Sequence, residues 1–214
     1  VEYGVPQKRK RVIILGSKIG IPKHPKPTHT NPNGFNLLNG HLKSWTTVKD
    51  AIGDLSLEPT GKDWHIGRNP TPTSLKRYKS IPPGGNRFDL PVALTPDCWM
   101  RKKTGSTDVF GRLKWDAPSL TFRTEFFKPE KGCYLHPKAH RPITIREAAR
   151  LQTFPDKYVF IGSNVQVAKQ IGNAVPCRLA YAVGKELFQL LNPSAYSIQN
   201  ETVDRLAPLQ RQLA

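Results

Sequence analysis

The arginines Arg9 and Arg11 are the first residues whose type and spacing could do chemistry. They alternate in a basic stretch that leads into the apolar run Arg11-Val-Ile-Ile-Leu-Gly16. In an extended chain both side chains project to the same side. A guanidinium stays charged and offers a planar fork of donors, which suits phosphate or base oxygens. The solvated entrance of a strand would show the same pattern, so both interpretations stay open.

A second pair, Arg146 and Arg150, is spaced four residues apart in a stretch with helical character. At this spacing both side chains share one helical face. The pair could clamp a phosphate, or it could hold a neighbouring domain through carboxylates and carbonyls. A solvated helical face explains the same residues equally well.

The segment Gln170-Ile-Gly-Asn-Ala-Val-Pro176 joins the end of one expected helix to the start of the next. Free N–H groups at a helix start and the amide of Asn173 could hold a ligand carboxylate or hydroxyl. A plain turn between helices is the alternative. Cys177 follows directly, and we interpret it as a small packing residue rather than a nucleophile, although a helix N-terminus lowers the pKa of a thiol.

The elements that must position these residues are a strand and three helices. The run from Arg11 to Gly16 predicts a buried strand. Thr144 and Glu147 fit a capping box, which predicts a helix from there to about Thr153. A second short helix should begin at Ser163 or Asn164 and end at Gly172. A third should begin at Pro176 and carry one apolar stripe, formed by Leu179, Ala180, Val183, Leu187 and Leu190.

Residues 18–140 have a different character, with many of the 20 prolines and 16 glycines of the chain. Only Thr47–Leu57 shows helical spacing, and Ile81-Pro-Pro-Gly-Gly-Asn-Arg87 predicts an exposed loop. We therefore expect a loop-rich domain of short strands. Its recurring aromatic residues should seed a core; they are Trp64, Phe88, Trp99, Phe110, Trp115, Phe122, Phe126 and Phe127.

The composition indicates a polyanion as partner. Thirty-three Lys and Arg against 16 Asp and Glu give a formal net charge of +17, concentrated in residues 1–50 and 101–150. Nucleic acid is the leading candidate, with a merely soluble basic surface or an anionic membrane as alternatives. No apolar run approaches the roughly 18 residues of a membrane span, and no leader opens the sequence, so we expect a soluble intracellular protein. The three cysteines are far apart, which signals neither a disulfide framework nor a metal site.

Three stretches resemble the C-terminal blocks of DNA cytosine-5 methyltransferases, and two further stretches between them resemble other parts of the same family. Tyr3-Gly-Val-Pro-Gln-Lys-Arg-Lys-Arg-Val-Ile-Ile-Leu15 resembles the Q-x-R-x-R block. The stretch from Arg141 to Asp156 resembles the block after the target recognition domain, and Gln170–Pro176 resembles the last block. Between them, Gly111–Thr121 and Tyr134-Leu-His-Pro137 resemble stretches at the end of that domain. Together they span roughly residues 2–190.

The resemblance implies roles for individual residues. Arg11 would touch the flipped target cytosine, and Arg9 would support that pocket or a nearby phosphate. Asn173 and Ala174 would lie against S-adenosylmethionine. The remaining implied residues bind DNA or organise the recognition domain against the catalytic domain; they are Gln7, Arg146 and Arg150. Residues of about 18–140 would read a specific sequence in double-stranded DNA.

The family chemistry also implies what must come from elsewhere. A cysteine thiolate adds to cytosine C6, and C5 takes the methyl group after the base has been flipped out of the duplex. The proline-cysteine loop, the glutamate block and the Gly-rich cofactor loop precede the Q-x-R-x-R block in a complete enzyme. We therefore expect a complementary N-terminal methyltransferase half or subunit as partner. The sequence fits a split subunit, a fragment of a longer enzyme or a relic of a broken gene.

The implied fold class is α/β: the C-terminal part of a Rossmann-like methyltransferase fold plus a small, loop-rich, mixed α/β recognition domain. Its expected regions are 1–17 (end of the catalytic domain), 18–140 (recognition domain), 141–192 (hinge helix and final helices) and 193–214 (tail). The expected function is cytosine-5 methylation in a prokaryotic restriction-modification system, in the cytoplasm near the nucleoid and without a metal. The alternatives are a stand-alone, non-catalytic DNA-binding module, and an unaided enzyme that uses Cys177 or Cys133.

Overall fold

The protein is built from short elements separated by long connections. The structure, a computed structural model, describes residues 1–33, 41–101 and 105–192. The strands are β1 (His29–Thr30), β2 (Lys43–Ser44), β3 (Gly111–Arg112) and β4 (Cys133–Leu135). The α-helices are α1 (Val48–Ile52), α2 (Pro72–Ser80), α3 (Asp97–Met100), α4 (Ile145–Leu151), α5 (Asn164–Asn173) and α6 (Cys177–Leu191). Short 3-10 turns are η2 (Arg87–Asp89), η3 (Val92–Leu94) and η4 (Pro129–Lys131).

Two compact units divide the chain. The first unit combines Val1–Lys10 with Pro27–Arg178, and the second combines Arg11–Lys26 with Leu179 and the residues after it. The domain boundaries expected at residues 17, 140 and 192 stay predictions, and the expected tail, 193–214, lies outside the described residues.

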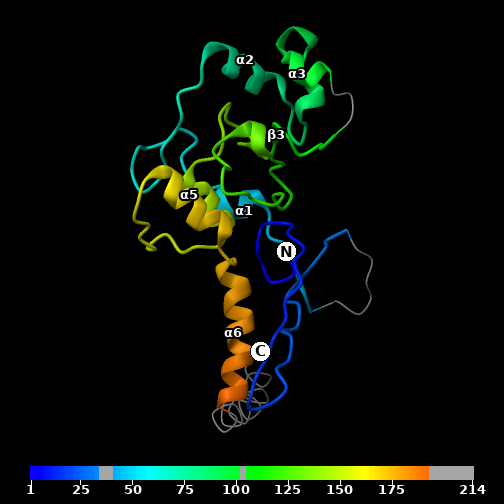
Figure 1. Cartoon of the computed structure of the whole chain (residues 1–214), viewed down its shortest axis with the longest axis vertical. Helices are drawn as coiled ribbons and strands as arrows, with labels where there is room; N and C mark the ends of the chain where they lie inside the picture. Colours follow the sequence, from blue (N-terminus) through cyan, green and yellow to red (C-terminus); the bar gives the residue numbers. More distant parts are fainter. Residues whose placement is uncertain (34–40, 102–104, 193–214) are drawn as a thin grey trace, which may run out of the picture. The chain divides into compact units, whose positions relative to one another are not determined.

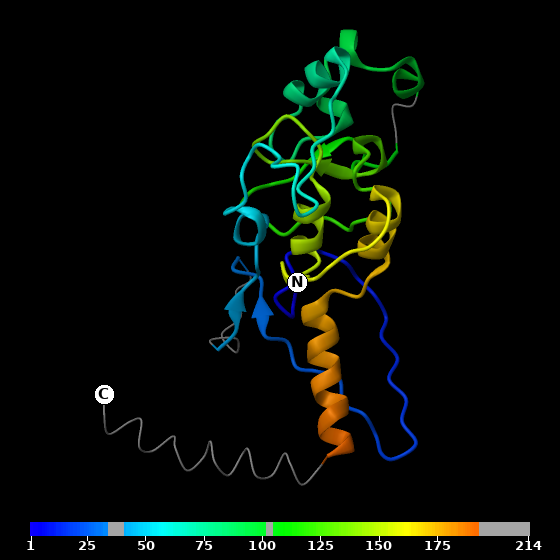
Figure 2. The ribbon, with the colours of Figure 1, turned by 90° about the vertical axis from the view of Figure 1, so that its left-hand side faces the viewer.

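The strands form two small parallel pairs. β1 pairs with β2 through His29 and Lys43, and Figure 2 shows these two strands side by side. β3 pairs with β4 in a register that shifts between Gly111 and Arg112. Short strands in a loop-rich region were predicted, and this prediction is confirmed.

The prediction of a buried strand at Arg11–Gly16 is wrong for this structure. These residues form no strand, and Val12 and Ile14 are 88% and 90% exposed. A strand persists only where a neighbouring strand accepts its hydrogen bonds. Within the described part of the chain, no strand takes that place.

Three helices begin with a capping box, as their sequences indicate. The Thr144 side chain accepts from the amide of Glu147, whose carboxylate accepts in return from the Thr144 amide. Ser163 caps α5 in the same way, and Thr47 caps α1. The helix ends differ from the predictions. α4 stops at Leu151 because Thr153 takes a left-handed conformation at φ 62°, and α1 stops at Ile52 before Gly53 instead of continuing to Leu57.

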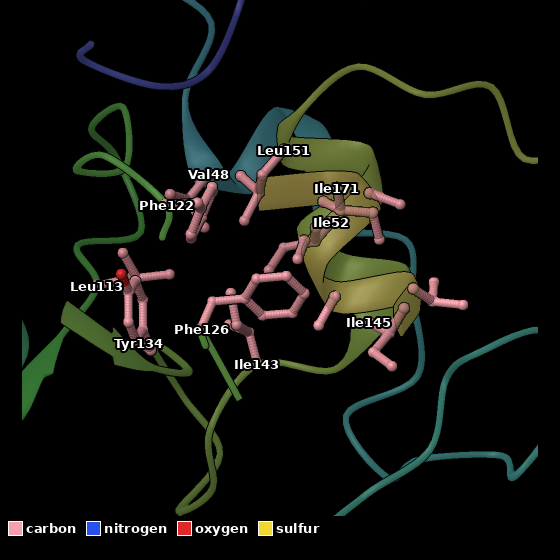
Figure 3. Packing of buried hydrophobic residues seen from close by; sticks show 14 of the residues in the cluster. Val48, Ile52, Leu113, Phe122, Phe126, Tyr134, Ile143, Ile145, Leu151 and Ile171 are labelled. Carbon is pink, nitrogen blue, oxygen red and sulfur yellow. The ribbon is translucent and has the colours of Figure 1, made fainter. Parts of the chain in front are cut away.

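The main core lies where α1, α4 and α5 meet the region of β3 and β4. Figure 3 shows Phe126 between the helical side chains and the pair Phe122 and Tyr134. Phe122 and Tyr134 stack with ring centroids 5.9 Å apart, and Phe126 is fully buried. The prediction of an aromatic core is therefore confirmed for Phe122 and Phe126. It is wrong for Phe88, which is 49% exposed.

A second, smaller cluster lies beside α2 and α3, on the far side of β3 from α1 (Figure 1). Its buried members are Tyr78, Ile81, Leu90, Phe110 and Leu135. The Ile81–Arg87 loop leaves this cluster, and its prolines are exposed as the sequence predicts. This cluster therefore packs α2 and the loop after it against β3 and β4.

Helix α6 buries none of its described side chains. The leucines and the valine of the predicted apolar stripe are half-buried, whereas Tyr181 and Phe188, outside the stripe, are 75% and 61% exposed. An amphipathic helix of this length gains most of its stability by burying its apolar face against another element. The exposed face of α6 is therefore a surface suited to packing.

Candidate functional site

The segment before Arg9 is held against residues 119–121 by backbone hydrogen bonds. The Lys8 amide donates to the Ser119 carbonyl at 2.8 Å, and the Ser119 amide donates to the Pro6 carbonyl at 2.9 Å. The Thr121 hydroxyl donates to the Lys8 carbonyl at 3.0 Å. The first block therefore lies beside the stretch that was expected at the end of the recognition domain.

Gln7 is part of this contact and is only 1% exposed. Its side-chain oxygen accepts from the Phe122 amide at 3.4 Å, while its side-chain nitrogen has no partner among the described residues. In this arrangement Gln7 joins the first block to the core and offers nothing to DNA at the surface. An organising role fits the geometry better than direct DNA contact.

Arg9 connects the first block with the last one. Its guanidinium donates to the carbonyl oxygen of Gly172 at 3.2 Å, across 163 positions of sequence. Arg9 is half-buried, whereas Arg11 is exposed and belongs to the second compact unit. Because no strand forms at these residues, their expected alignment at the mouth of a strand is not confirmed.

Gly172 permits α5 to approach the backbone of Arg123 and Thr124 closely. A Cβ at this position would lie 2.7 Å from the Thr124 Cα and 2.8 Å from the Arg123 carbonyl oxygen. Both neighbours are backbone atoms, which cannot rotate away as a side chain can. The glycine in the last block therefore permits close packing, whereas the sequence predicted only that a helix ends there, in a segment that could be a ligand site or a turn.

Asn173 is exposed at the end of α5, and Ala174 behind it is half-buried. Asn173 borders a hollow of about 570 Å³. The other lining residues are Ile161, Gly162, Gln166, Lys169 and Gln170. The side chain of Gln170 is fixed by a hydrogen bond to the Ile161 carbonyl at 3.0 Å. The hollow thus offers amide groups and one ammonium beside an aliphatic side chain.

Arg146 and Arg150 bind loops rather than solvent. Arg146 is 6% exposed and donates to the carbonyl oxygens of Asp63 at 2.8 Å and Asp156 at 3.2 Å. Arg150 forms a bidentate pair with the Asp156 carboxylate, at 2.8 and 2.6 Å, and a further pair with Asp54. The alternative of a solvated helical face is therefore wrong. Both arginines tie α4 to residues 54–63 and to the turn after the helix.

The sequence analysis missed a buried ion pair beneath the same helix. Arg141 and Glu147 are 7% and 1% exposed and form two hydrogen bonds, at 2.9 and 2.7 Å. Burial alone would raise the pKa of Glu147, but the hydrogen bonds and charge of Arg141 bring that pKa below its usual range. Glu147 thereby serves the capping box and the ion pair together. Only the capping box is visible in the sequence, because Arg141 lies outside the helical pattern.

His136 lies beside this pair in its neutral form. Its Nδ1 accepts from the amides of Lys138 at 3.1 Å and Ala139 at 2.8 Å, so the ring proton is on Nε2. Nε2 is 3.7 Å from the nearer Glu147 oxygen, which is too long for a hydrogen bond. Burial lowers the pKa of His136 to about 4. The residue therefore contributes no charge at neutral pH.

Neither of the two cysteines considered as nucleophiles is activated. Burial raises the pKa of Cys133 to about 12 and also raises the pKa of Cys177. The amide of Cys177 at the start of α6 donates to the Gln152 carbonyl at 3.2 Å. Because the thiolate is the nucleophilic form, these thiols are unsuited to attack at neutral pH.

No group of three His, Cys, Asp or Glu residues is arranged to hold a metal ion in the part of the chain that was described. None of the helices described is long and apolar enough to cross a membrane.

Comparison with known proteins identifies the class to which these blocks belong. The family model for C-5 cytosine-specific DNA methylases matches residues 1–189. The chain therefore belongs to the C-5 cytosine-specific DNA methylase family, whose members generally take the methyl group from S-adenosylmethionine.

Among individual relatives, the Type II methylase M.HgiDII of Herpetosiphon aurantiacus is 34% identical over 201 residues, covering 89% of this chain and 53% of the relative. The Type II methyltransferase M.PspPI of a Psychrobacter species is 37% identical over 194 residues, covering 89% and 44%. The chain thus spans about half the length of these relatives. A solved structure of a prophage-encoded E. coli protein, assigned as a DNA modification methyltransferase, shares the fold at a TM-score of 0.50. The two chains are 23% identical, and the match covers 89% of this chain and 58% of that chain.

Proposed function

We propose that this chain forms the DNA-recognising half of a cytosine-5 DNA methyltransferase from a restriction-modification system. The observation that carries the proposal is the convergence of the family blocks, in which Arg9 of the first block donates to Gly172 of the last. The Gln7 backbone and side chain bring the end of the recognition region to the same place. The chain acts near the nucleoid, where its DNA substrate lies.

In this proposal each half supplies part of the chemistry. Arg11 binds the flipped cytosine, with Arg9 supporting its pocket, and residues 18–140 read the DNA sequence. The catalytic cysteine, the glutamate and the Gly-rich cofactor loop come from a complementary N-terminal half. The cysteines considered in this chain fit that division, because burial keeps both thiols protonated.

The hollow beside Asn173 fits part of S-adenosylmethionine. Asn173 and Gln170 present amides for a carboxylate or hydroxyl, and Ile161 presents an apolar surface. When bound, the cofactor supplies an electrophilic methyl group. The residues of this chain hold and orient it, and the remaining contacts come from the complementary half.

Exposed apolar residues support association with such a half. Within the second unit, Val12 and Ile14 are almost fully exposed, and α6 exposes Tyr181 and Phe188. Large apolar residues gathered on two segments of one unit mark a protein-binding surface. The complementary half would pair with the extended segment and cover the apolar face of α6.

Reconstitution tests the proposal. The chain is mixed with the N-terminal part of a relative such as M.PspPI that carries the proline-cysteine loop. Transfer of labelled methyl from S-adenosylmethionine to DNA should require both parts. Arg11→Ala should abolish transfer, whereas Lys157→Ala, an exposed cation outside residues 18–140, should not. If both parts are folded and associated but no methyl is transferred, the proposal fails, and sequence-specific binding by the chain alone would then favour a non-catalytic DNA-binding module.

A further inference from the structure

Three lysines and one histidine lie on segments that the buried arginine Arg112 or its neighbours hold together in the recognition region. Lys79 is in the last turn of α2, Lys114 follows β3, and Lys138 and His140 follow β4. All four are exposed, and they come from three segments separated in sequence. We call these four residues the Arg112 basic surface.

Arg112 fixes the segments that carry these cations. It is 3% exposed and donates only to carbonyl oxygens. Its Nε donates to Ile81 at 2.7 Å, and NH1 donates to Ala139 at 2.9 Å. Further bonds reach the carbonyls of His136 and Tyr78. One guanidinium therefore joins the end of α2 to the chain after β4. These bonds fix the backbone next to Lys79 and Lys138.

The Pro82–Asn86 loop is fixed between these segments. The Gly84 amide donates to the Arg112 carbonyl at 3.1 Å, and the Arg112 amide donates to the Gly85 carbonyl at 3.0 Å. The methylene chain of Lys114 lies on Gly84, where a Cβ would come within 2.3 Å of the Lys114 Cε. Gly84 has φ 75°, a left-handed conformation that favours glycine.

The cations are oriented and close enough to influence one another. The Lys138 ammonium lies 4.6 Å from the centre of the Trp115 ring, a contact that orders its side chain. The pKa of His140 is lowered by partial burial and then by the charges of Arg112 and Lys79. The hydrogen bonds of Arg112 to the carbonyls of Tyr78, Ile81 and Ala139 hold together the backbone next to Lys79, Lys138 and His140.

No carboxylate within 4.0 Å neutralises Lys79, Lys114 or Lys138 in the described part of the chain, although the exposed Asp116 lies two residues from Lys114. The carboxylate Asp89 lies by Gly85, but it accepts from the Asn86 amide at 2.7 Å. The amides of Gly84 and Gly85 are also bonded within the protein. The backbone therefore has no free donor in this loop, and an anion would be bound by the side-chain cations.

We propose that the Arg112 basic surface binds the phosphate backbone of double-stranded DNA, with Arg112 as the positioning residue. This inference rests on the proposed function and specifies which surface of the recognition region meets the phosphates. Lysine ammonium groups act as point charges, and contacts to phosphate position a protein without reading sequence. The surface therefore supplies affinity that does not depend on the DNA sequence.

The test measures binding of the full chain to duplex DNA over a series of salt concentrations. Each phosphate contact contributes about 0.9 to the slope of log K against log salt. The variant Lys79→Gln, Lys114→Gln, Lys138→Gln should weaken binding and reduce the magnitude of that slope by about 3. The matched control is Lys49→Gln, Lys62→Gln, Lys157→Gln, which removes the same charge from exposed positions of the same unit.

Equal slopes for the two triple variants overturn the inference, because net charge alone would then explain binding. A chain that binds no duplex DNA at low salt overturns it as well. The proposed function is tested separately by methyl transfer in the reconstituted enzyme. Methyl transfer with equal slopes would reject only this inference, whereas the expected slopes without methyl transfer would reject only the proposed function.

Discussion

The guanidinium of Arg9 donates to the carbonyl oxygen of Gly172 at 3.2 Å, which joins the first and last family blocks directly. Gly172 also packs against the backbone of Arg123 and Thr124. One residue without a side chain is therefore the point where the first block, the end of the recognition region and α5 meet. The position of α5 relative to both neighbours depends on it.

Gly172→Ala should destabilise the protein. The added methyl would lie 2.7 Å from the Thr124 Cα, so α5 must shift away from residues 123–124. Overpacking of this kind costs about 1–3 kcal/mol of folding stability.

Urea unfolding measures this cost, and the matched control is Gly184→Ala in α6. Gly184 has no atom within 4 Å of an added Cβ, so that change should stabilise by up to about 1 kcal/mol. Equal effects would show that close approach at Gly172 is unimportant.

Arg141→Met should destabilise the protein strongly, because it leaves the Glu147 carboxylate buried without its partner. Loss of one member of a buried pair costs about 3–5 kcal/mol. The midpoint of urea unfolding should fall without a change in slope. Lys131→Met is the control: it breaks an exposed pair with Glu125, at 3.7 Å, which contributes little to stability because solvent screens the two charges. A loss at Arg141 no larger than at Lys131 would contradict the structural importance of the buried pair.

The sequence predicts best where structure is determined by neighbours along the chain. The capping box at Thr144 and Glu147 and the start of α5 after Ser163 depend on residues three positions apart, and both are confirmed. The end of α4 was predicted about two residues too late, because the left-handed conformation of Thr153, at φ 62°, has no signal in the local sequence. The strand at Arg11–Gly16 needs a pairing partner, which its own residues cannot specify.

The same limit applies to the candidate site. Arg9 could be selected from its type and spacing, but its partner Gly172 is 163 residues away. Arg112 carries no local signal, since all four of its carbonyl acceptors lie at least 24 residues from it in sequence. Long-range partners of buried arginines follow from the fold and cannot be read from periodicity.

Stability should decrease on acidification between about pH 6.5 and pH 4 because of His136. The unfolded chain takes up a proton near the ordinary histidine pKa of about 6.5, whereas folded His136 takes it up only near its pKa of about 4. The unfolded state thus binds more protons in this window, which costs the fold roughly 3 kcal/mol. Glu147, whose pKa is lowered in the folded state, adds a loss below about pH 4.3.

His136→Asn isolates the histidine contribution, because an asparagine oxygen can accept from the Lys138 and Ala139 amides but does not titrate. Free energies of unfolding at several pH values should show a flatter dependence between pH 6.5 and 4 for the variant than for the unchanged protein. Parallel curves would mean that His136 is protonated alike in the folded and unfolded states.

Arg112→Lys should be costly although it preserves the charge. Burial lowers the pKa of Arg112, so the fold already works against its positive charge, and four carbonyl oxygens compensate it. A lysine ammonium has three donors at one point and cannot span these acceptors. At least one carbonyl is therefore left unpaired, which costs about 1–3 kcal/mol.

Arg77→Lys is the control, because half-buried Arg77 is bonded to one carbonyl, that of Leu94 at 2.7 Å. This change should cost less than about 1 kcal/mol. Hydrogen exchange at the Gly84 amide, which donates to the Arg112 carbonyl, should accelerate only in Arg112→Lys. Unchanged exchange would show that the loop keeps its place without the guanidinium, and that the lysines around it are positioned by β3 and β4 alone.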